Sequence, residues 1–272
     1  MISPKHFLSF IFTMTSISQA FAANDCKNQS VSFEKDGFKV RTLKYESVDP
    51  SSKYILVMPP TGGTNYLDRS YAETLCEKGF NVFVVEGWTG DQEFSWELDI
   101  HRRFYTRSQD AIDLVTKNIQ GSFIGILGTS VGAIHAAIAV QHHDRIQAAF
   151  LITGGAPISE VIANSDQEIL LKMRRQRFTA MGFKSQNDYV QAIDQVLPMD
   201  PFNSSPIAPT KKLAMVIAPE DTTVPADTQK SLRDLWRPQW TLEMSGSHKS
   251  VIIKTWLLHR NKVVDFFKNA TL

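Results

Sequence analysis

Short apolar runs alternate with amphipathic stretches along most of the chain. A continuous apolar run, such as residues 54–58, is typical of a strand buried on both faces, and the alternating pattern at 38–45 is typical of a half-exposed strand. The predicted strands cover residues 38–45, 54–58, 80–85, 123–127, 148–152, 213–218 and 240–244. The predicted helices cover residues 70–78, 103–118, 131–142 and 251–267. This alternation predicts an α/β fold, with a mostly parallel sheet flanked by helices on both sides.

One segment, residues 156–210, breaks the alternation. It has no strand pattern, contains several helical stretches, and is too long for a simple connection. We predict that it forms a helical cap over the carboxyl edge of the sheet, where ligands of open α/β sheets bind. Some of its apolar side chains should line a substrate pocket or pack on the rim of the sheet. These side chains are Leu170, Leu171, Met173, Phe178, Met181 and Phe183.

Two members of this set, Phe178 and Met181, are our candidates for the substrate pocket. Trp88, which follows the strand at 80–85, is a third candidate, although ordinary loop packing explains it equally well. The cap also carries four basic residues between 170 and 178, namely Lys172, Arg174, Arg175 and Arg177. They could face an anionic substrate or a lipid surface, but we interpret them as a solvated face whose charges point outward or toward the entrance.

Composition narrows the class of protein only slightly. The chain has 272 residues, of which 43% are hydrophobic, so it can form one large domain with its own core. Its formal net charge of +1 offers no support for binding nucleic acid. The sequence leaves the oligomeric state open.

Residues 1–22 have the layout of a secretory signal peptide. An apolar stretch at 7–17 is followed by Ala20 and Ala22 at the two specificity positions of a cleavage site. The apolar stretch is shorter than the roughly 20 residues that span a bilayer, although a short membrane anchor or a buried first helix is an alternative. We therefore predict a protein exported to the periplasm or secreted, with no stable membrane anchor and a mature domain of residues 24–272.

The two cysteines of the chain are Cys26 and Cys76. In the oxidising compartment that a signal peptide implies, we predict that they form a disulfide, which would close a loop of about 50 residues. Two unpaired thiols are the alternative.

The segment Gly128-Thr129-Ser130-Val131-Gly132 places a serine between two glycines, after a buried strand and before an alanine-rich helix. A serine on such a sharp turn has a strained backbone. Side chains at positions 128 and 132 would collide with neighbouring groups, so both positions require glycine. The helix that follows directs the backbone N–H of Val131 toward a developing oxyanion. Ser130 is therefore a candidate nucleophile.

A serine hydroxyl needs a base, and the base needs an acid to orient it. Among the histidines, only His248 is predicted in a loop after a late strand, beyond the acid candidates. The others outside the leader are interpreted as structural or surface residues: His101, His135, His142, His143 and His259. The acid candidates follow the strand at 213–218 and are Asp221, Glu220 and Asp227.

Together these motifs resemble the α/β-hydrolase superfamily across nearly all of the mature chain. The order Ser130, Asp221, His248 is the order of that superfamily. The resemblance implies an eight-stranded-type sheet with a cap after its sixth strand. It also favours Asp221 as the acid, because Val-Pro follows three and four residues later. The segment Asp200-Pro201, before the strand at 213–218, resembles the corresponding segment of esterases and serine peptidase-like hydrolases of the dienelactone and acyl-aminoacyl type.

The same resemblance assigns the loop after the third strand to the oxyanion hole. Pro59-Pro60 stands where a His-Gly pair is common in the superfamily, and Thr61-Gly62-Gly63 follows. By position Thr61 supplies the second backbone N–H beside that of Val131, with Gly62 as the alternative.

The predicted function is hydrolysis of an ester, or as second choice an amide, through an acyl-enzyme. The substrate is expected to be a small molecule or an acyl compound that the sequence does not identify. An acyltransferase with the same triad and a catalytically silent binding protein of the same fold are the alternatives. The sequence has no zinc-spaced cluster of histidines and cysteines and no glycine-rich phosphate loop, so we expect no metal and no cofactor.

Overall fold

The computed structural model describes residues 26–48, 52–89, 95–203, 207 and 210–271. The predicted signal peptide, residues 1–22, lies outside these ranges and stays a prediction. Within the ranges, every helix is too short or too polar to cross a membrane.

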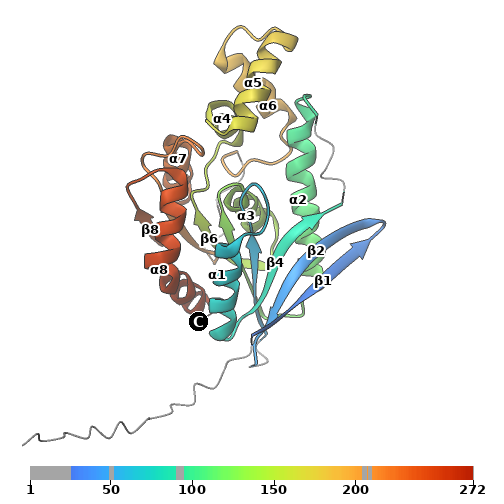
Figure 1. Ribbon diagram of the computed structural model, residues 1–272, viewed down its shortest axis with the longest axis vertical. Coiled ribbons are helices and arrows are strands. Elements are labelled where there is room, and N and C mark those ends of the chain that lie inside the picture. Colours follow the sequence, from blue (N-terminus) through green and yellow to red (C-terminus); the bar gives the residue numbers. More distant parts are fainter. Residues whose placement is uncertain (1–25, 49–51, 90–94, 204–206, 208–209, 272) are drawn as a thin grey trace, which may run out of the picture.

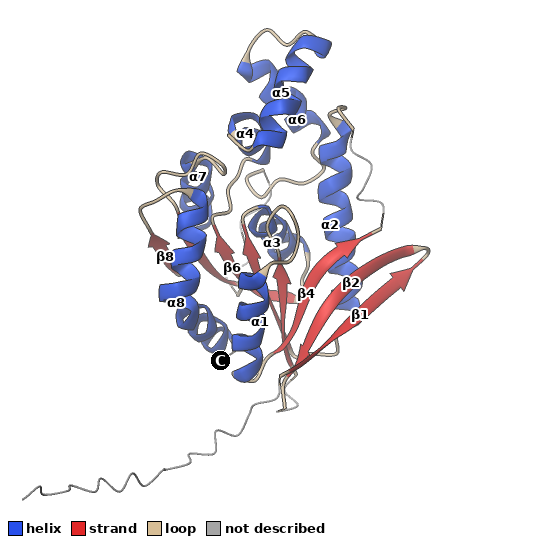
Figure 2. Ribbon diagram, viewed as in Figure 1, coloured by secondary structure: helices blue, strands red, loops and turns tan. Residues whose placement is uncertain are grey.

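Eight strands form one twisted sheet (Figure 2). They are β1 (Lys27–Lys35), β2 (Phe38–Glu46), β3 (Lys53–Met58), β4 (Asn81–Trp88), β5 (Phe123–Thr129), β6 (Ile146–Ile152), β7 (Lys212–Ile217) and β8 (Trp240–Glu243). Their order across the sheet is β1-β2-β4-β3-β5-β6-β7-β8. The strand β2 is antiparallel to both of its neighbours, and every other neighbouring pair is parallel. The predicted fold class, a mostly parallel eight-stranded sheet flanked by helices, is confirmed.

Helices cover both faces of this sheet. They are α1 (Tyr66–Glu77), α2 (Asp99–Lys117), α3 (Val131–His142), α7 (Ala226–Trp236) and α8 (His248–Ala270). Side chains alternate along each strand, so each strand contributes to two cores. In β3, Leu56 and Met58 pack with α2, α3 and α7, whereas Ile55 and Val57 pack with α1 and α8. The sheet is therefore buried on both faces, as its apolar runs predict.

Three further helices form the insertion between β6 and β7. They are α4 (Ile158–Asn164), α5 (Glu168–Met181) and α6 (Gln186–Val196). Figure 1 shows them above the carboxyl ends of the central strands, beside the start of α2. A third core cluster joins them to the body through Tyr105 of α2 and through Ile134 and Ile138 of α3. The insertion thus lies after the sixth strand, where the sequence predicts a helical cap.

Some elements differ from the sequence prediction. The strand β1 was not anticipated, because Val31 and Phe33 are its only apolar residues and both are only partly buried. The helix α7 was not anticipated either, since its buried face includes the polar residues Thr228 and Gln229 and gives a weak apolar stripe. The helices α1, α2 and α8 begin three or four residues earlier than predicted.

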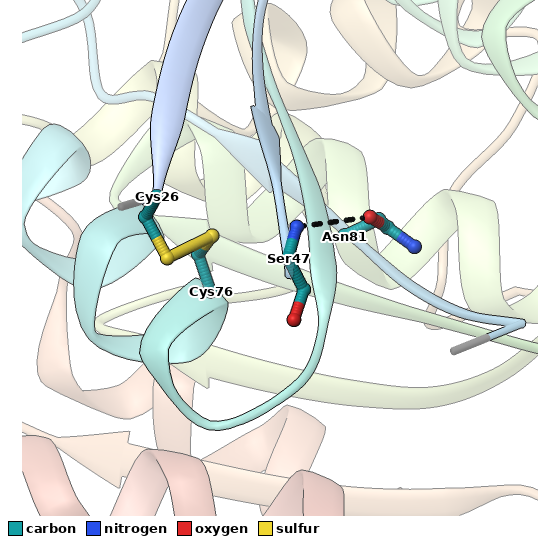
Figure 3. Close-up of a disulfide and its surroundings, with 4 residues drawn as sticks. All are labelled: Cys26, Ser47, Cys76 and Asn81. Atoms are coloured by element: carbon teal, nitrogen blue, oxygen red, sulfur yellow. Dashed lines mark hydrogen bonds between the residues drawn. A yellow bond between two sulfur atoms is a disulfide. The ribbon is translucent and has the colours of Figure 1, made fainter. Parts of the chain in front are cut away.

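The predicted disulfide between Cys26 and Cys76 is present (Figure 3). Cys26 directly precedes β1, and Cys76 is a buried residue in the last turn of α1. Beside it, the backbone N–H of Ser47 donates to the side-chain oxygen of Asn81 at 3.2 Å, which joins the end of β2 to the start of β4. The disulfide therefore ties the start of the edge strand to a helix on one face of the sheet.

We expect Cys26→Ser to lower the free energy of unfolding by up to about 4 kcal/mol, the loop-closure value for a ring of this size. Cys26 is the better position to change, because Cys76 is packed in the core. Urea unfolding of the variant and the wild type measures the loss. Alkylation without reductant should add no mass to the wild type, and two alkylated thiols would contradict the disulfide.

Candidate active site

Ser130 lies at the sharp turn between the end of β5 and the first residue of α3. Its φ is 58° and its ψ is −124°, a conformation that residues with a side chain rarely adopt. Both flanking glycines are required for this turn. A methyl group on Gly128 would overlap the main chain at Ala133, and one on Gly132 would overlap the carbonyl oxygen of Met58. The turn therefore has the geometry expected of a nucleophile elbow.

Ser130, His248 and Asp221 form a continuous series of hydrogen bonds. The Nε2 atom of His248 lies 2.8 Å from Ser130 Oγ, and its Nδ1 atom lies 2.6 Å from Asp221 Oδ2. All three residues are buried. Because the carboxylate accepts, Nδ1 carries the proton and leaves the Nε2 lone pair for the serine hydroxyl. In this arrangement the imidazole can remove the proton of Ser130.

The Asp221 carboxylate is held by four hydrogen bonds. Its Oδ1 accepts from the backbone N–H groups of Thr223 at 2.8 Å and Val224 at 3.1 Å, and its Oδ2 accepts from Gln229 Nε2 at 2.8 Å as well as from His248. The two rival acids do not have this position, because Glu220 is exposed and the side chain of Asp227 is 99% exposed. Gln229 was missed by sequence analysis, since it lies on α7, which was also missed.

His248 is the first residue of α8 rather than a loop residue as expected, and Ser247 is the N-cap. The other histidines lie elsewhere. Burial lowers the pKa of His135 to about 3, which keeps its ring neutral on α3 behind the elbow. His101 is also buried, at the start of α2. In the part of the chain that the structure describes, no three histidine, cysteine, aspartate or glutamate side chains lie together as a potential metal site.

Two backbone N–H groups are candidates for an oxyanion hole. Val131 is the first residue of α3, so its N–H has no acceptor within the helix. Thr61, in the loop after β3, lines a cavity together with Ser130 and Val131. Gly62, the alternative donor, lines only a smaller cavity, which Thr61 and Val131 also border but Ser130 does not. The structure thus brings Thr61 and Val131 to the nucleophile.

The cavity beside Ser130 has a volume of about 230 Å³. Most of its wall is apolar and comes from α2, α3 and the insertion, including Phe104, Ile134, Ile162 and Met173. Ser130 also borders a second groove, which is lined by His248 and by Asp166 of the insertion. Ser130 therefore lies where an apolar cavity meets a more polar groove.

The three predicted pocket residues do not line the cavity with Ser130. Phe178 packs inside the insertion against Phe183 and Tyr189, with ring centroids 5.8 and 5.6 Å away. Met181 is 44% exposed. Trp88 is the last residue of β4 and lines the smaller cavity together with Gly62. The wall instead uses the face of α5 that carries Leu170 and Met173.

The four basic residues of the insertion do not form one solvated face. Lys172 and Arg175 are exposed as expected, but Arg174 donates to the backbone carbonyls of Ala163 and Ser165. Arg177 is 1% exposed, so the expectation that its charge points outward or to the entrance was wrong. A periodic pattern shows which positions share a helix face and not which face is covered.

Hydrogen bonds also fasten the insertion to the loop that carries Asp221. The carboxylate of Asp166 accepts from the hydroxyls of Thr222 at 2.5 Å and Thr223 at 2.7 Å, and Ser165 Oγ donates to the carbonyl of Thr223 at 2.6 Å. The hydrogen bonds from the hydroxyls of Thr222 and Thr223 hold the pKa of the Asp166 carboxyl below its usual value. Thr223 also lines the cavity, so this connection fixes the insertion beside Ser130.

No protein-family model matches the sequence, and no curated protein is detectably similar to it. Several solved structures share its fold. The esterase Pf2001 from Pyrococcus furiosus is 13% identical, with a TM-score of 0.62 over 91% of this chain and 94% of its own. The α/β hydrolase GrgF from Penicillium sp. sh18 is 15% identical, with a TM-score of 0.63 over 90% and 99%.

An acylaminoacyl peptidase from Pyrococcus horikoshii is 15% identical, with a TM-score of 0.65 over 89% of this chain. This chain covers 41% of that peptidase. The strand order, the turn at Ser130 and these likenesses agree on the class of fold. The chain has the α/β-hydrolase fold.

Proposed function

We propose that this protein is an exported serine hydrolase that cleaves an ester through an acyl-enzyme. The observation that carries the proposal is the series of hydrogen bonds from Ser130 through His248 to Asp221 on a strained turn. The solved structures of similar fold include an esterase and an acylaminoacyl peptidase, which supports hydrolytic chemistry. The disulfide supports export, because such bonds persist in oxidising compartments.

In the first half of the reaction, His248 takes the proton of Ser130 while the hydroxyl oxygen attacks the acyl carbon. Asp221 holds the imidazole in the required tautomer and stabilises the imidazolium that forms. The N–H groups of Thr61 and Val131 bind the oxyanion, and each such donor contributes about 10²–10³ in rate. The imidazolium then protonates the leaving alcohol, and the acyl group stays on Ser130.

In the second half, His248 takes a proton from a water that attacks the acyl-enzyme, and it returns this proton to Ser130 Oγ as the carboxylic acid leaves. The apolar cavity of α2, α3 and the insertion is the proposed acyl site, because its mostly apolar wall suits an aliphatic acyl chain. The groove lined by His248 and Asp166 is the proposed path for the alcohol and the water, since His248 exchanges protons with both. The insertion is the proposed cap over the acyl site.

A panel of p-nitrophenyl esters of increasing acyl length tests this proposal, with aminoacyl and peptide substrates beside it. We expect saturable turnover of short esters, and a burst of p-nitrophenol when deacylation is slow. Added alcohols and amines separate hydrolysis from acyl transfer. Absence of turnover across the whole panel would contradict the proposal.

Met173 is expected to limit the length of the acyl chain. It is 4% exposed and lines the proposed acyl site, so Met173→Ala should enlarge the cavity. We expect the ratio of kcat/KM for octanoyl over butanoyl esters to rise by about tenfold, the effect of a few buried methylene groups. Met181→Ala, an exposed position on the same helix, is the matched control and should leave the ratio unchanged. Equal effects of the two variants on this ratio would show that Met173 does not line the acyl site.

A further inference from the structure

Arg177 is a buried cation beside the cavity that contains Ser130. Its side chain is among the largest fully buried ones in the described chain. It donates to the backbone carbonyls of Trp96 at 2.7 Å and Glu97 at 2.8 Å, to Tyr189 Oη at 2.9 Å, and to His101 Nε2 at 2.7 Å. All four acceptors are neutral groups. Among the described residues no carboxylate accepts from this guanidinium. Burying a charge without an opposite charge is costly, so an anion nearby would stabilise this arrangement.

His101 connects Arg177 to the cavity. A guanidinium can only donate, so His101 Nε2 accepts and the ring proton is on Nδ1. Burial, with a further contribution from Arg177, lowers the pKa of His101 to about 3, and the ring is therefore neutral at physiological pH. His101 lines the cavity, and its Nδ1 has no hydrogen-bond partner among the residues described. An N–H donor is thus available to a ligand in the cavity.

Two further cations on α2 line the same cavity. Arg103 and Arg107 lie one turn apart on the face of the helix that borders it. Arg103 forms an ion pair with Asp99 at 3.5 Å. Arg107 forms a long one with Asp110 at 3.6 Å, between half-exposed side chains where such pairs contribute little, and its guanidinium lies 5.2 Å from the centre of the Phe38 ring. Within the described chain, the wall of this cavity includes no aspartate or glutamate.

The geometry points to an acyl group that carries a carboxylate at its far end, so that the preferred substrate is a monoester of a short dicarboxylic acid. This inference rests on the proposed function. The ester carbonyl lies at Ser130, the methylene groups lie along the apolar wall, and the carboxylate accepts from His101 Nδ1 and from the α2 guanidinium groups. Charge-assisted hydrogen bonds of this kind are stronger than neutral ones. The volume of about 230 Å³ is below the roughly 300–1,000 Å³ of most ligand sites, which favours a short chain.

The test compares ethyl hydrogen adipate with ethyl hexanoate, which has the same number of acyl carbons and no carboxylate, by the release of ethanol. For the wild type we expect kcat/KM to be at least about tenfold higher for the acidic ester, mainly through KM. His101→Phe and Arg103→Met should each lower this preference, measured for each variant as its own ratio of kcat/KM for the acidic ester over ethyl hexanoate. Arg175→Met removes an exposed cation of the insertion outside the cavity and is the matched control.

Circular dichroism and Tm show whether each variant is folded. If His101→Phe does not fold, Arg103→Met alone tests the inference. A wild type that cleaves ethyl hexanoate as well as or better than the acidic ester would overturn the inference and leave the proposed function intact. Should neither ester be cleaved, binding of ethyl hydrogen adipate decides the inference independently. This compound is expected to raise the Tm of the wild type and not that of Arg103→Met. Equal shifts in Tm for both proteins would overturn the inference.

Discussion

Ser130→Ala is expected to lower kcat/KM for any substrate of this protein by at least about 10⁴-fold and toward 10⁶-fold, the range seen when a triad nucleophile is removed. The hydroxyl is the attacking group, and its loss leaves only binding and oxyanion stabilisation. The fold should persist, because His248 Nε2, at 2.8 Å, is the only hydrogen-bond partner of Ser130 Oγ among the residues that the structure describes. Loss of the hydroxyl leaves the backbone of the turn unchanged. Initial rates and Tm measure the two effects separately.

Ser108→Ala is the matched control for this variant. Ser108 is also a buried serine, on α2, and its hydroxyl donates to the carbonyl of Tyr105 at 2.8 Å. Its removal should lower the free energy of unfolding by about 1 kcal/mol and leave kcat/KM nearly unchanged. If Ser130→Ala kept more than about one per cent of the activity, another residue would have to be the nucleophile.

Asp221→Asn is expected to lower kcat by on the order of 10⁴-fold. Both carboxylate oxygens of Asp221 accept hydrogen bonds, from two backbone N–H groups, from Gln229 and from His248. An amide has one acceptor oxygen and one NH₂ group, which only donates, so the NH₂ group must face donors that now bind a carboxylate oxygen. If that donor is His248 Nδ1–H, the imidazole changes tautomer and no longer accepts from Ser130. Stability should also fall, because a buried group loses its partner.

Glu220→Gln is the control for this prediction. Glu220 is the neighbouring acid, and its side chain is exposed. We expect an effect of less than twofold on kcat, as for other changes in surface charge. A larger loss in Glu220→Gln than in Asp221→Asn would show that the wrong acid has been assigned.

The local chemistry of the elbow could be predicted from sequence because it depends on residues close together in the chain. Gly128 and Gly132 are required by steric contacts, and that requirement is visible as a pattern around Ser130. His248 and Asp221 are far from Ser130 in sequence. Their placement followed from the rule that loops after parallel strands meet at one edge of the sheet. The structure brings the three side chains within hydrogen-bond distance.

The residues around the triad could not be predicted in the same way. On α5 the apolar positions form more than one face, and the sequence does not show that Met173 faces the cavity whereas Phe178 packs against Tyr189. The burial of Arg177 depends on carbonyl groups about 80 residues earlier in the chain. Such long-range partners leave no periodic signal.

Weak hydrophobic patterns account for the missed elements of secondary structure. The strand β1 is held at the sheet edge mainly by its pairing with β2, a contact between main chains that requires few apolar residues. The helix α7 buries Gln229. Its side chain donates a hydrogen bond to Asp221 and accepts one from the backbone N–H of Ala218. A buried polar residue of this kind breaks the apolar stripe by which an amphipathic helix is predicted.

The most direct test of the account is covalent labelling of the protein with a fluorophosphonate, followed by intact mass and peptide mapping. A serine activated by a neighbouring histidine should react once, at Ser130, and the His248→Ala variant should react far more slowly. We predict one adduct per chain, located on the peptide that contains Gly128 to Gly132. An unlabelled wild-type protein, or an adduct on a different residue, would contradict the assignment of Ser130 as the nucleophile.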